Sequence, residues 1–202
     1  MQRRGLHGIL EISAVYNIVQ RLFQHEPTQT VWNSFISQKK LGSVLDVGCG
    51  PGNQSKNFSK SEGYIGIDIS EFYIAKARER FGNFGNFEVL SALDVDKLPD
   101  KNFDLVILSG VLHHMTNDEV TLFFAKVREK LSPDGLVVTV DPVYCRGRYF
   151  ANFLVSLDRG MHVRTNAQLT DLAQKYFTIL KTSIIEQKIP PYQRILFKLS
   201  KH

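Results

Sequence analysis

Cysteine and long apolar segments are both scarce in this chain of 202 residues. Its two cysteines, Cys49 and Cys145, lie far apart and match neither a metal-binding nor a disulfide spacing, which argues against a zinc ribbon or a disulfide-stapled secreted domain. No apolar run approaches the ~18–20 residues that a helix needs to cross a bilayer. The N-terminal segment is interrupted by Glu11 and Asn17 and lacks the unbroken apolar stretch of a signal peptide. We therefore expect a cytoplasmic protein with reduced cysteines and no metal site.

Repeats, low-complexity tracts and linkers are also missing, which favours a single domain over residues 1–202. The hydrophobic fraction of 43% and the charged fraction of 22% are ordinary for a globular protein. The formal charge of +5 suits an anionic partner, such as a phosphorylated metabolite, a nucleic acid or a membrane surface. A solvated basic surface without such a partner is the simpler alternative.

Apolar runs that alternate with polar, helix-like segments predict an α/β fold. The runs are rich in Val and Ile, as are parallel strands that are buried on both faces. Between them, Ser70 is placed to cap a helix over residues 71–80, and Thr116 or Asn117 to cap a helix that continues through Leu131. Residues 132–135, Ser-Pro-Asp-Gly, then predict a turn. The predicted strands are residues 44–47, 64–67, 87–90, 103–108 and 136–140.

The C-terminal part has a different pattern. Residues 177–189 and 192–199 are predicted to be strands, and Pro190-Pro191 separates them. A connection this short leaves no room for a crossover helix, so we expect the two strands to pair antiparallel. The whole pattern predicts a doubly wound, mostly parallel seven-stranded sheet that ends in an antiparallel hairpin.

A glycine-rich loop directly follows the first predicted strand, with the sequence DVGCGPG over residues 46–52. Its glycines let the backbone turn tightly and approach a ligand, at the sheet edge where α/β folds bind nucleotides. Asp46, at the strand end, can meet a cationic ligand group directly or through water. A tight turn alone or a dinucleotide site are the alternatives, but Asn53 stands where the dinucleotide fingerprint has its third glycine.

Two further carboxylates follow the next two predicted strands. Asp68 ends the second strand, where an acidic side chain can accept hydrogen bonds from both hydroxyls of a ribose, a role that nicotinamide sites share. Asp94 follows the third strand, where a carboxylate can accept from the exocyclic amine of an adenine while apolar neighbours cover the ring. Asp94 and the glycine spacing therefore argue against a nicotinamide oxidoreductase.

In this order and spacing, the motifs resemble those of class I S-adenosylmethionine-dependent methyltransferases. The resemblance runs from residue 12 to residue 140 and includes the glycine-rich loop, residues 94–99 and residues 103–106. It is greatest to the small-molecule, type 11-like subgroup, whose fourth strand ends in a Leu-His-His-type sequence, here LHHM over residues 112–115. The resemblance implies a Rossmann-like fold and S-adenosylmethionine as the cofactor, with S-adenosylhomocysteine as the product.

The resemblance also implies which residues bind the cofactor. An N-terminal helical lid over residues 1–40 would supply Tyr16 and Gln20, although the same helix pattern equally suits packing on the sheet edge. The other implied residues are Asp46 near the glycine loop, Gly48, Gly50 and Ser109 beside the methionine part, Asp68 on the ribose, Ile69 beside the adenine and Asp94 on its amine.

Methyl transfer from a sulfonium is an in-line displacement, in which the enzyme holds the nucleophile, excludes water and sometimes removes a proton. His114 is the candidate catalytic residue, whereas His113 is expected to hydrogen-bond the backbone where the following helix begins. Residues 141–175 are the implied acceptor-side insertion. Its basic residues either bind an anionic acceptor or are solvated cations, with Asp158 and Arg159 paired at the surface. Its candidate acceptor-binding residues are Tyr144, Arg146, Arg148, Tyr149, Arg159, His162 and Arg164.

The sequence thus predicts a methyltransferase that acts on a small or lipid-linked, anionic acceptor, with a basic, aromatic segment suited to peripheral membrane contact. A cofactor-binding regulatory protein without turnover remains an alternative. An RNA methyltransferase is disfavoured, because the basic residues are spread out and no RNA-binding module is visible. The Pro-Pro-Tyr sequence at residues 190–192 resembles that of nucleic-acid amino-methylating enzymes, but its position favours a hairpin turn. Cys145 lacks the flanking pattern of a covalent nucleophile.

Overall fold

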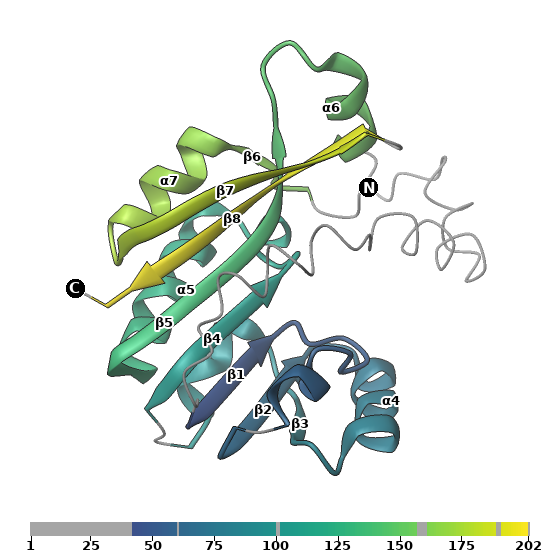
Figure 1. Ribbon diagram of the computed structural model, residues 1–202, viewed down its shortest axis with the longest axis vertical. Coiled ribbons are helices and arrows are strands. Elements are labelled where there is room, and N and C mark those ends of the chain that lie inside the picture. Colours follow the sequence, from purple (N-terminus) through teal and green to yellow (C-terminus); the bar gives the residue numbers. More distant parts are fainter. Residues whose placement is uncertain (1–41, 60, 100–101, 157–160, 189–190, 202) are drawn as a thin grey trace.

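The computed structural model describes residues 42–59, 61–99, 102–156, 161–188 and 191–201 (Figure 1). The predicted lid over residues 1–40, with Tyr16 and Gln20, lies outside these ranges, and so does Arg159. Among the described helices, none is both long and apolar enough to span a bilayer.

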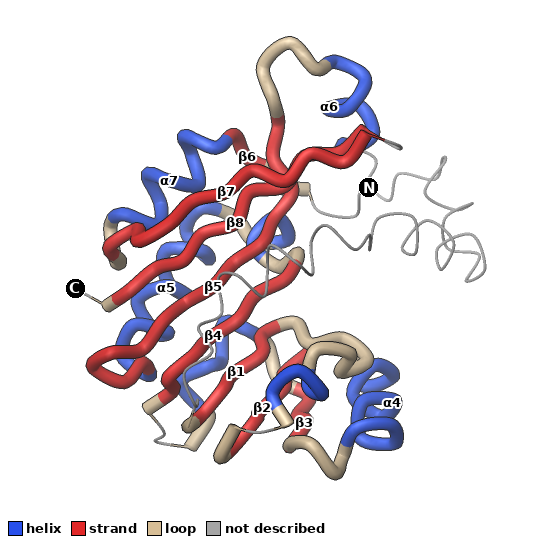
Figure 2. The backbone as a smooth tube through the Cα atoms, in the orientation of Figure 1, coloured by secondary structure: helices blue, strands red, loops and turns tan. Residues whose placement is uncertain are grey.

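A mixed sheet runs through the centre of the described chain (Figure 2). Its main strands are β1 (Ser43–Val47), β2 (Gly63–Asp68), β3 (Asn86–Val89), β4 (Phe103–Ser109), β5 (Leu131–Tyr144), β7 (Thr178–Lys188) and β8 (Pro191–Ser200). They lie in the order β3-β2-β1-β4-β5-β8-β7, and the first five pair parallel while β8 pairs antiparallel with β5 and β7. This confirms the predicted doubly wound sheet with its C-terminal hairpin. The two-residue strand β6 (Arg164–Thr165), which pairs with the end of β5, was not predicted.

Two helices begin at the predicted caps. Ser70 Oγ accepts a hydrogen bond of 3.3 Å from the backbone N of Tyr73 and so caps α4 (Glu71–Phe81). Thr116, rather than Asn117, caps α5 (Asn117–Lys130), because its Oγ1 accepts from the backbone N of Glu119 at 3.3 Å. The Glu119 carboxylate accepts in return from the backbone N of Thr116 at 2.7 Å, which completes a capping box.

Several connections differ from a plain alternation of strands and helices. Among the described residues, the glycine loop leads into a 3-10 turn, η1 (Ser55–Phe58), and β3 leads into another, η2 (Ala92–Lys97). A third, η3 (Leu112–His114), separates β4 from α5. The predicted turn at residues 132–135 lies within β5, but there the register against β4 jumps from Leu131 to Leu136, so this segment loops out of the ladder.

Helices cover both faces of the sheet. Successive residues of a strand point to opposite faces, and in β1 Leu45 belongs to the apolar cluster that contains Phe123 of α5, whereas Val44 belongs to the cluster that contains Ile74 of α4. Helix α7 (Asn166–Gln174) lies on the α5 side through Leu169, and helix α6 (Tyr149–Ser156) follows β5. The apolar runs of β1, β2 and β4 are therefore buried on both faces, as the sequence predicted, whereas in β3 only Phe87 is buried.

Candidate active site at the carboxyl edge of the sheet

The carboxyl ends of the parallel strands meet at one edge, and the strand order reverses at β1, which lies between β2 and β4. In open α/β sheets this is where ligands bind. Two backbone hydrogen bonds hold the loops at this edge to the neighbouring strands. Gly48 N donates to Ile67 O of β2 at 2.8 Å, and Gly110 N donates to Val140 O of β5 at 2.8 Å.

The glycine loop combines one closely packed glycine with one open glycine. Gly48 and Gly50 have φ angles of +68° and +53°, in the left-handed region that favours glycine. A Cβ on Gly48 would lie 2.5 Å from Cγ2 of Val111, so the loop packs closely on the segment after β4. A Cβ on Gly50 would meet nothing within 4 Å. Within the described ranges, the backbone of Gly50 is therefore open to a ligand.

Asp68 lies directly beside this open position. Its Oδ2 accepts a hydrogen bond from Gly50 N at 2.9 Å, and its Oδ1 accepts one from Ser70 N at 2.9 Å. A carboxylate oxygen has capacity for more than one hydrogen bond, and the side chain is only half-buried. The structure thus brings together Gly50 and Asp68, and the carboxylate keeps acceptor capacity for a ligand.

Asp46 lies beneath the loop and is almost fully buried. Its Oδ2 accepts a hydrogen bond of 2.5 Å from the hydroxyl of Tyr64, a residue of β2 that sequence reasoning did not connect with the site. Burial raises the pKa of Asp46 to about 7; the Tyr64 hydrogen bond lowers it in part, and the nearby Asp68 carboxylate raises it further. Asp46 was expected to meet a cationic ligand group directly or through water. Because its carboxylate is buried and bonded to Tyr64, this arrangement favours the contact through water.

The two residues expected around an adenine occupy neighbouring segments. Ile69 follows β2 with its side chain 76% exposed, which leaves apolar surface at the edge of the sheet. Asp94 lies in η2 and pairs with Nζ of Lys97 at 2.9 Å, so a ligand amine would share or replace that partner. Lys126 of α5 fastens this segment by donating to the Asp96 carboxylate at 2.7 Å. Ser109, the last residue of β4, is exposed.

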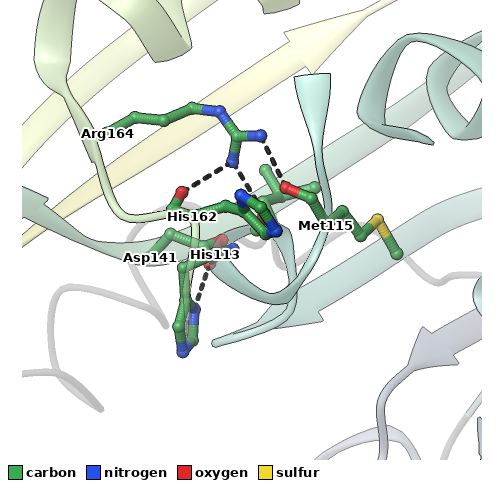
Figure 3. A network of polar contacts seen from close by, with 6 residues as sticks. His113, Met115, Asp141, His162 and Arg164 are labelled. Atoms are coloured by element: carbon green, nitrogen blue, oxygen red, sulfur yellow. Dashed lines mark hydrogen bonds and ion pairs between the residues drawn. The ribbon is translucent and has the colours of Figure 1, made fainter. Parts of the chain in front are cut away.

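A buried pair of side chains fixes the segment after β4 (Figure 3). His113 Nδ1 lies 3.0 Å from Oδ1 of Asp141, and the backbone N of His113 donates to the same oxygen at 3.2 Å. His113 was expected to hydrogen-bond the backbone where α5 begins, and the structure adds a bond to a carboxylate of β5 that the sequence did not predict. Among the described residues, Asp141 Oδ2 is buried without a hydrogen-bond partner. His114, the predicted catalytic residue, is exposed, and its ring centroid lies 4.1 Å from that of His113.

Arg164 holds the same segment from the other side (Figure 3). It is 5% exposed, and its guanidinium donates to the backbone oxygens of Leu112 at 2.8 Å, of Met115 at 2.6 Å and of His162 at 3.0 Å. Its Nε donates to the side chain of Asn117 at 2.8 Å. Arg164 was expected to bind an acceptor anion, but these bonds occupy most of its N–H donors and give it a structural role instead.

The other residues expected on the acceptor side are spread over the connection between β5 and β6. Tyr144 and His162 are half-buried at its two ends, and the backbone N of His162 donates to His113 O at 3.0 Å. Arg146 is exposed, and Arg148 pairs with Glu186 of β7 at 2.8 Å. Tyr149 is 86% exposed on α6. That they converge on one anionic group stays a prediction.

Neither cysteine is in a reactive setting. Burial raises the pKa of the Cys49 thiol, with the nearby Asp46 and Asp68 carboxylates acting in the same direction. Burial also raises the pKa of Cys145, whose Sγ contacts the side-chain oxygen of Gln193. In the part of the chain that the structure describes, no group of three or more His, Cys, Asp or Glu side chains is arranged to hold a metal ion.

Comparison with known proteins supports the motifs at this edge. Residues 44–135 match the family model described as a methyltransferase domain. The chain is 34% identical over 104 residues to the ubiquinone/menaquinone biosynthesis C-methyltransferase UbiE of Cupriavidus taiwanensis, covering 48% of this chain and 42% of that protein. It is 30% identical over 154 residues to tenellin synthetase of Beauveria bassiana, covering 67% of this chain but only 4% of the synthetase.

Among solved structures, the fold is similar to that of the N-methyltransferase NodS from Bradyrhizobium japonicum WM9. The TM-score is 0.73 at 14% identity, and the similarity covers 89% of this chain and 96% of NodS. NodS has also been solved in complex with S-adenosyl-l-homocysteine. From its glycine loop, its sheet and these matches, residues 44–135 of the chain belong to the S-adenosylmethionine-dependent methyltransferase family.

Proposed function

We propose that the protein is an enzyme that transfers a methyl group from S-adenosylmethionine to a small or lipid-linked, anionic acceptor. The observation that carries this proposal is the open Gly50 backbone beside the half-buried Asp68 carboxylate, at the point where the strand order reverses. The family membership of the chain and the NodS complex with S-adenosyl-l-homocysteine support the choice of cofactor.

The residues at this edge fit the parts of that cofactor. The space beside Gly50 admits a bulky group against the backbone, and the remaining acceptor capacity of Asp68 suits the two hydroxyls of a ribose. Ile69 offers apolar surface to a ring, and Asp94 offers a carboxylate to its amine. Gly48 and Ser109 flank the space on the side of β4. When bound, the cofactor supplies an electrophilic methyl group on a sulfonium.

The chain's own contribution to the transfer is to place the acceptor and to take up its proton. We assign the base to His114, which is exposed and lies beside His113 at the same edge of the sheet. His113 is a positioning residue, because its bonds to Asp141 fix the backbone and the ring against which His114 lies. A base held in this way contributes about 10²–10⁴-fold to a rate that requires proton removal.

The connection between β5 and β6 is the proposed acceptor side of the domain. Tyr144 and His162 stand at its base, and His162 is bonded to the His113 segment, so an acceptor that binds there lies close to the base. Arg146 remains the candidate for an anionic group. Helix α7, within the predicted insertion over residues 141–175, packs against α5 and β7.

Transfer itself is tested with S-adenosylmethionine that carries a tritium-labelled methyl group. The protein is incubated with the aqueous and the organic phases of a cell extract, and we expect label in a non-protein compound from one phase. His114→Gln should reduce that transfer by about 10²–10⁴-fold while S-adenosylhomocysteine still binds. Binding of the cofactor without transfer to either phase would instead favour a regulatory protein without turnover.

A further inference from the structure

The connection between β5 and β6 displays apolar side chains on its outer surface. Tyr149 is 86% exposed, Phe150 65% and Phe153 56% on α6, and Met161, which follows the helix, is 87% exposed. Several large exposed apolar residues on one short segment mark a binding surface more often than a solvated one. We name these four residues the α6 surface.

The helix that carries this surface is firmly attached to the sheet. Ala151 and Val155 of α6 are buried, at 6% and 1% exposure. Asn152 makes two bonds with the backbone of Cys145, accepting from its N at 2.9 Å and donating to its O at 2.8 Å. Because α6 buries Ala151 and Val155, its exposed aromatic residues form a second apolar stripe on the other side of the helix. Figure 1 shows where α6 follows β5.

Charge on the same segment selects the partner. Residues 145–163 contain three arginines, one aspartate and neither lysine nor glutamate. Arg146 and Arg148 directly precede α6, and both are exposed, but Arg148 pairs with Glu186 of β7 at 2.8 Å, so Arg146 is the main cation beside the α6 surface. Aromatic and apolar side chains beside arginines match the boundary between lipid acyl chains and anionic head groups, where the rings enter the interface and the cations remain at the phosphates.

We propose that the α6 surface docks on an anionic lipid membrane. The same connection returns to the proposed site, because the backbone N of His162 donates to His113 O at 3.0 Å. Docking would therefore place the acceptor side of the domain at the lipid surface and select a lipid-linked acceptor among those proposed above. That last step rests on the proposed function, whereas docking itself does not.

The experiment is flotation of the full chain with vesicles of phosphatidylcholine alone and of phosphatidylcholine mixed with phosphatidylglycerol. We expect binding to the mixed vesicles, and about tenfold weaker binding when Phe150→Ser removes one interfacial ring. Arg146→Gln should weaken binding by about fivefold, as expected for one cation near an anionic surface. Phe72→Ser is the matched control, since Phe72 is 62% exposed on α4 and should leave vesicle binding unchanged.

On the same samples, circular dichroism shows whether each variant is folded, and calorimetry with S-adenosylhomocysteine shows whether it binds the cofactor. A failure of membrane docking can therefore be told apart from a failure of the proposed function. No binding of the wild type to the mixed vesicles would overturn the proposal. The occupant of the α6 surface would then be another protein or residues 1–41 rather than a membrane. Binding that persists in Phe150→Ser/Phe153→Ser would overturn it as well. A dimer in sedimentation that this double variant abolishes, without vesicle binding by the wild type, would assign the surface to a second copy of the chain.

Discussion

Alanine at three glycines with positive φ separates the cost of backbone strain from the cost of lost ligand space. Gly50 and Gly147 have φ angles of +53° and +80°, and at neither would a Cβ meet an atom of the described residues within 4 Å. Each substitution should cost about 1–2 kcal/mol of the free energy of unfolding, because an L residue is strained in the left-handed region. At Gly48 the strain is combined with a Cβ placed 2.5 Å from Val111. Overpacking of this kind adds about 1–3 kcal/mol.

Urea denaturation and calorimetry with S-adenosylhomocysteine measure the two effects. Gly50→Ala and Gly147→Ala should lose similar stability, and Gly48→Ala should lose more than either. Only Gly50→Ala and Gly48→Ala should lose ligand affinity, by about tenfold or more, because an alanine at 50 fills the open space beside Asp68. Gly147→Ala should bind as the wild type does. Wild-type affinity in Gly50→Ala would refute the placement of the cofactor on this loop.

Three further substitutions test the supports of the site. Burial raises the pKa of Asp46 from 3.8 to about 7, so the folded state holds a proton that the unfolded state releases. The free energy of unfolding should therefore fall by up to roughly 4 kcal/mol as pH rises from about 4 to about 7. Asp46→Asn should abolish this fall in urea titrations across that range. Arg164→Met leaves the buried oxygens of Leu112 and Met115 without their donor and should cost about 3 kcal/mol in the same assay; a loss below ~1 kcal/mol would contradict its clamping role. Thr116→Ala removes the cap of α5 and should cost about 1 kcal/mol, with little loss if the cap is dispensable.

The parts of the fold that depend on local patterns were predictable from the sequence. Apolar runs placed the strands because the central ones are buried on both faces. Ser70 and Thr116 marked helix starts because a side-chain oxygen there satisfies a free backbone N–H. The glycine loop was also predictable from a local pattern, because its positive φ angles favour glycine. The antiparallel hairpin followed from the short connection between its strands, whereas the short β6 was not predictable, because two residues carry no periodic signal.

The long-range polar contacts were not predictable in the same way. Arg164 was expected to bind an acceptor, but its partners are mostly backbone oxygens, which any residue supplies and which leave no mark in the sequence. Tyr64 reaches Asp46 from a neighbouring strand, and only the register of β1 and β2 brings them together. Asp141 did carry a signal, since it follows an apolar run as Asp46 and Asp68 do, and this position pairs it with His113.

The most direct test of the central claim is calorimetric binding of S-adenosylmethionine and S-adenosylhomocysteine, with NAD as the control ligand. We expect micromolar binding of the first two, none of NAD, and loss of binding in Asp68→Ala when circular dichroism shows that the variant is folded. Absence of binding to the wild-type chain, or wild-type affinity in Asp68→Ala, would contradict the assignment of the cofactor to this edge of the sheet.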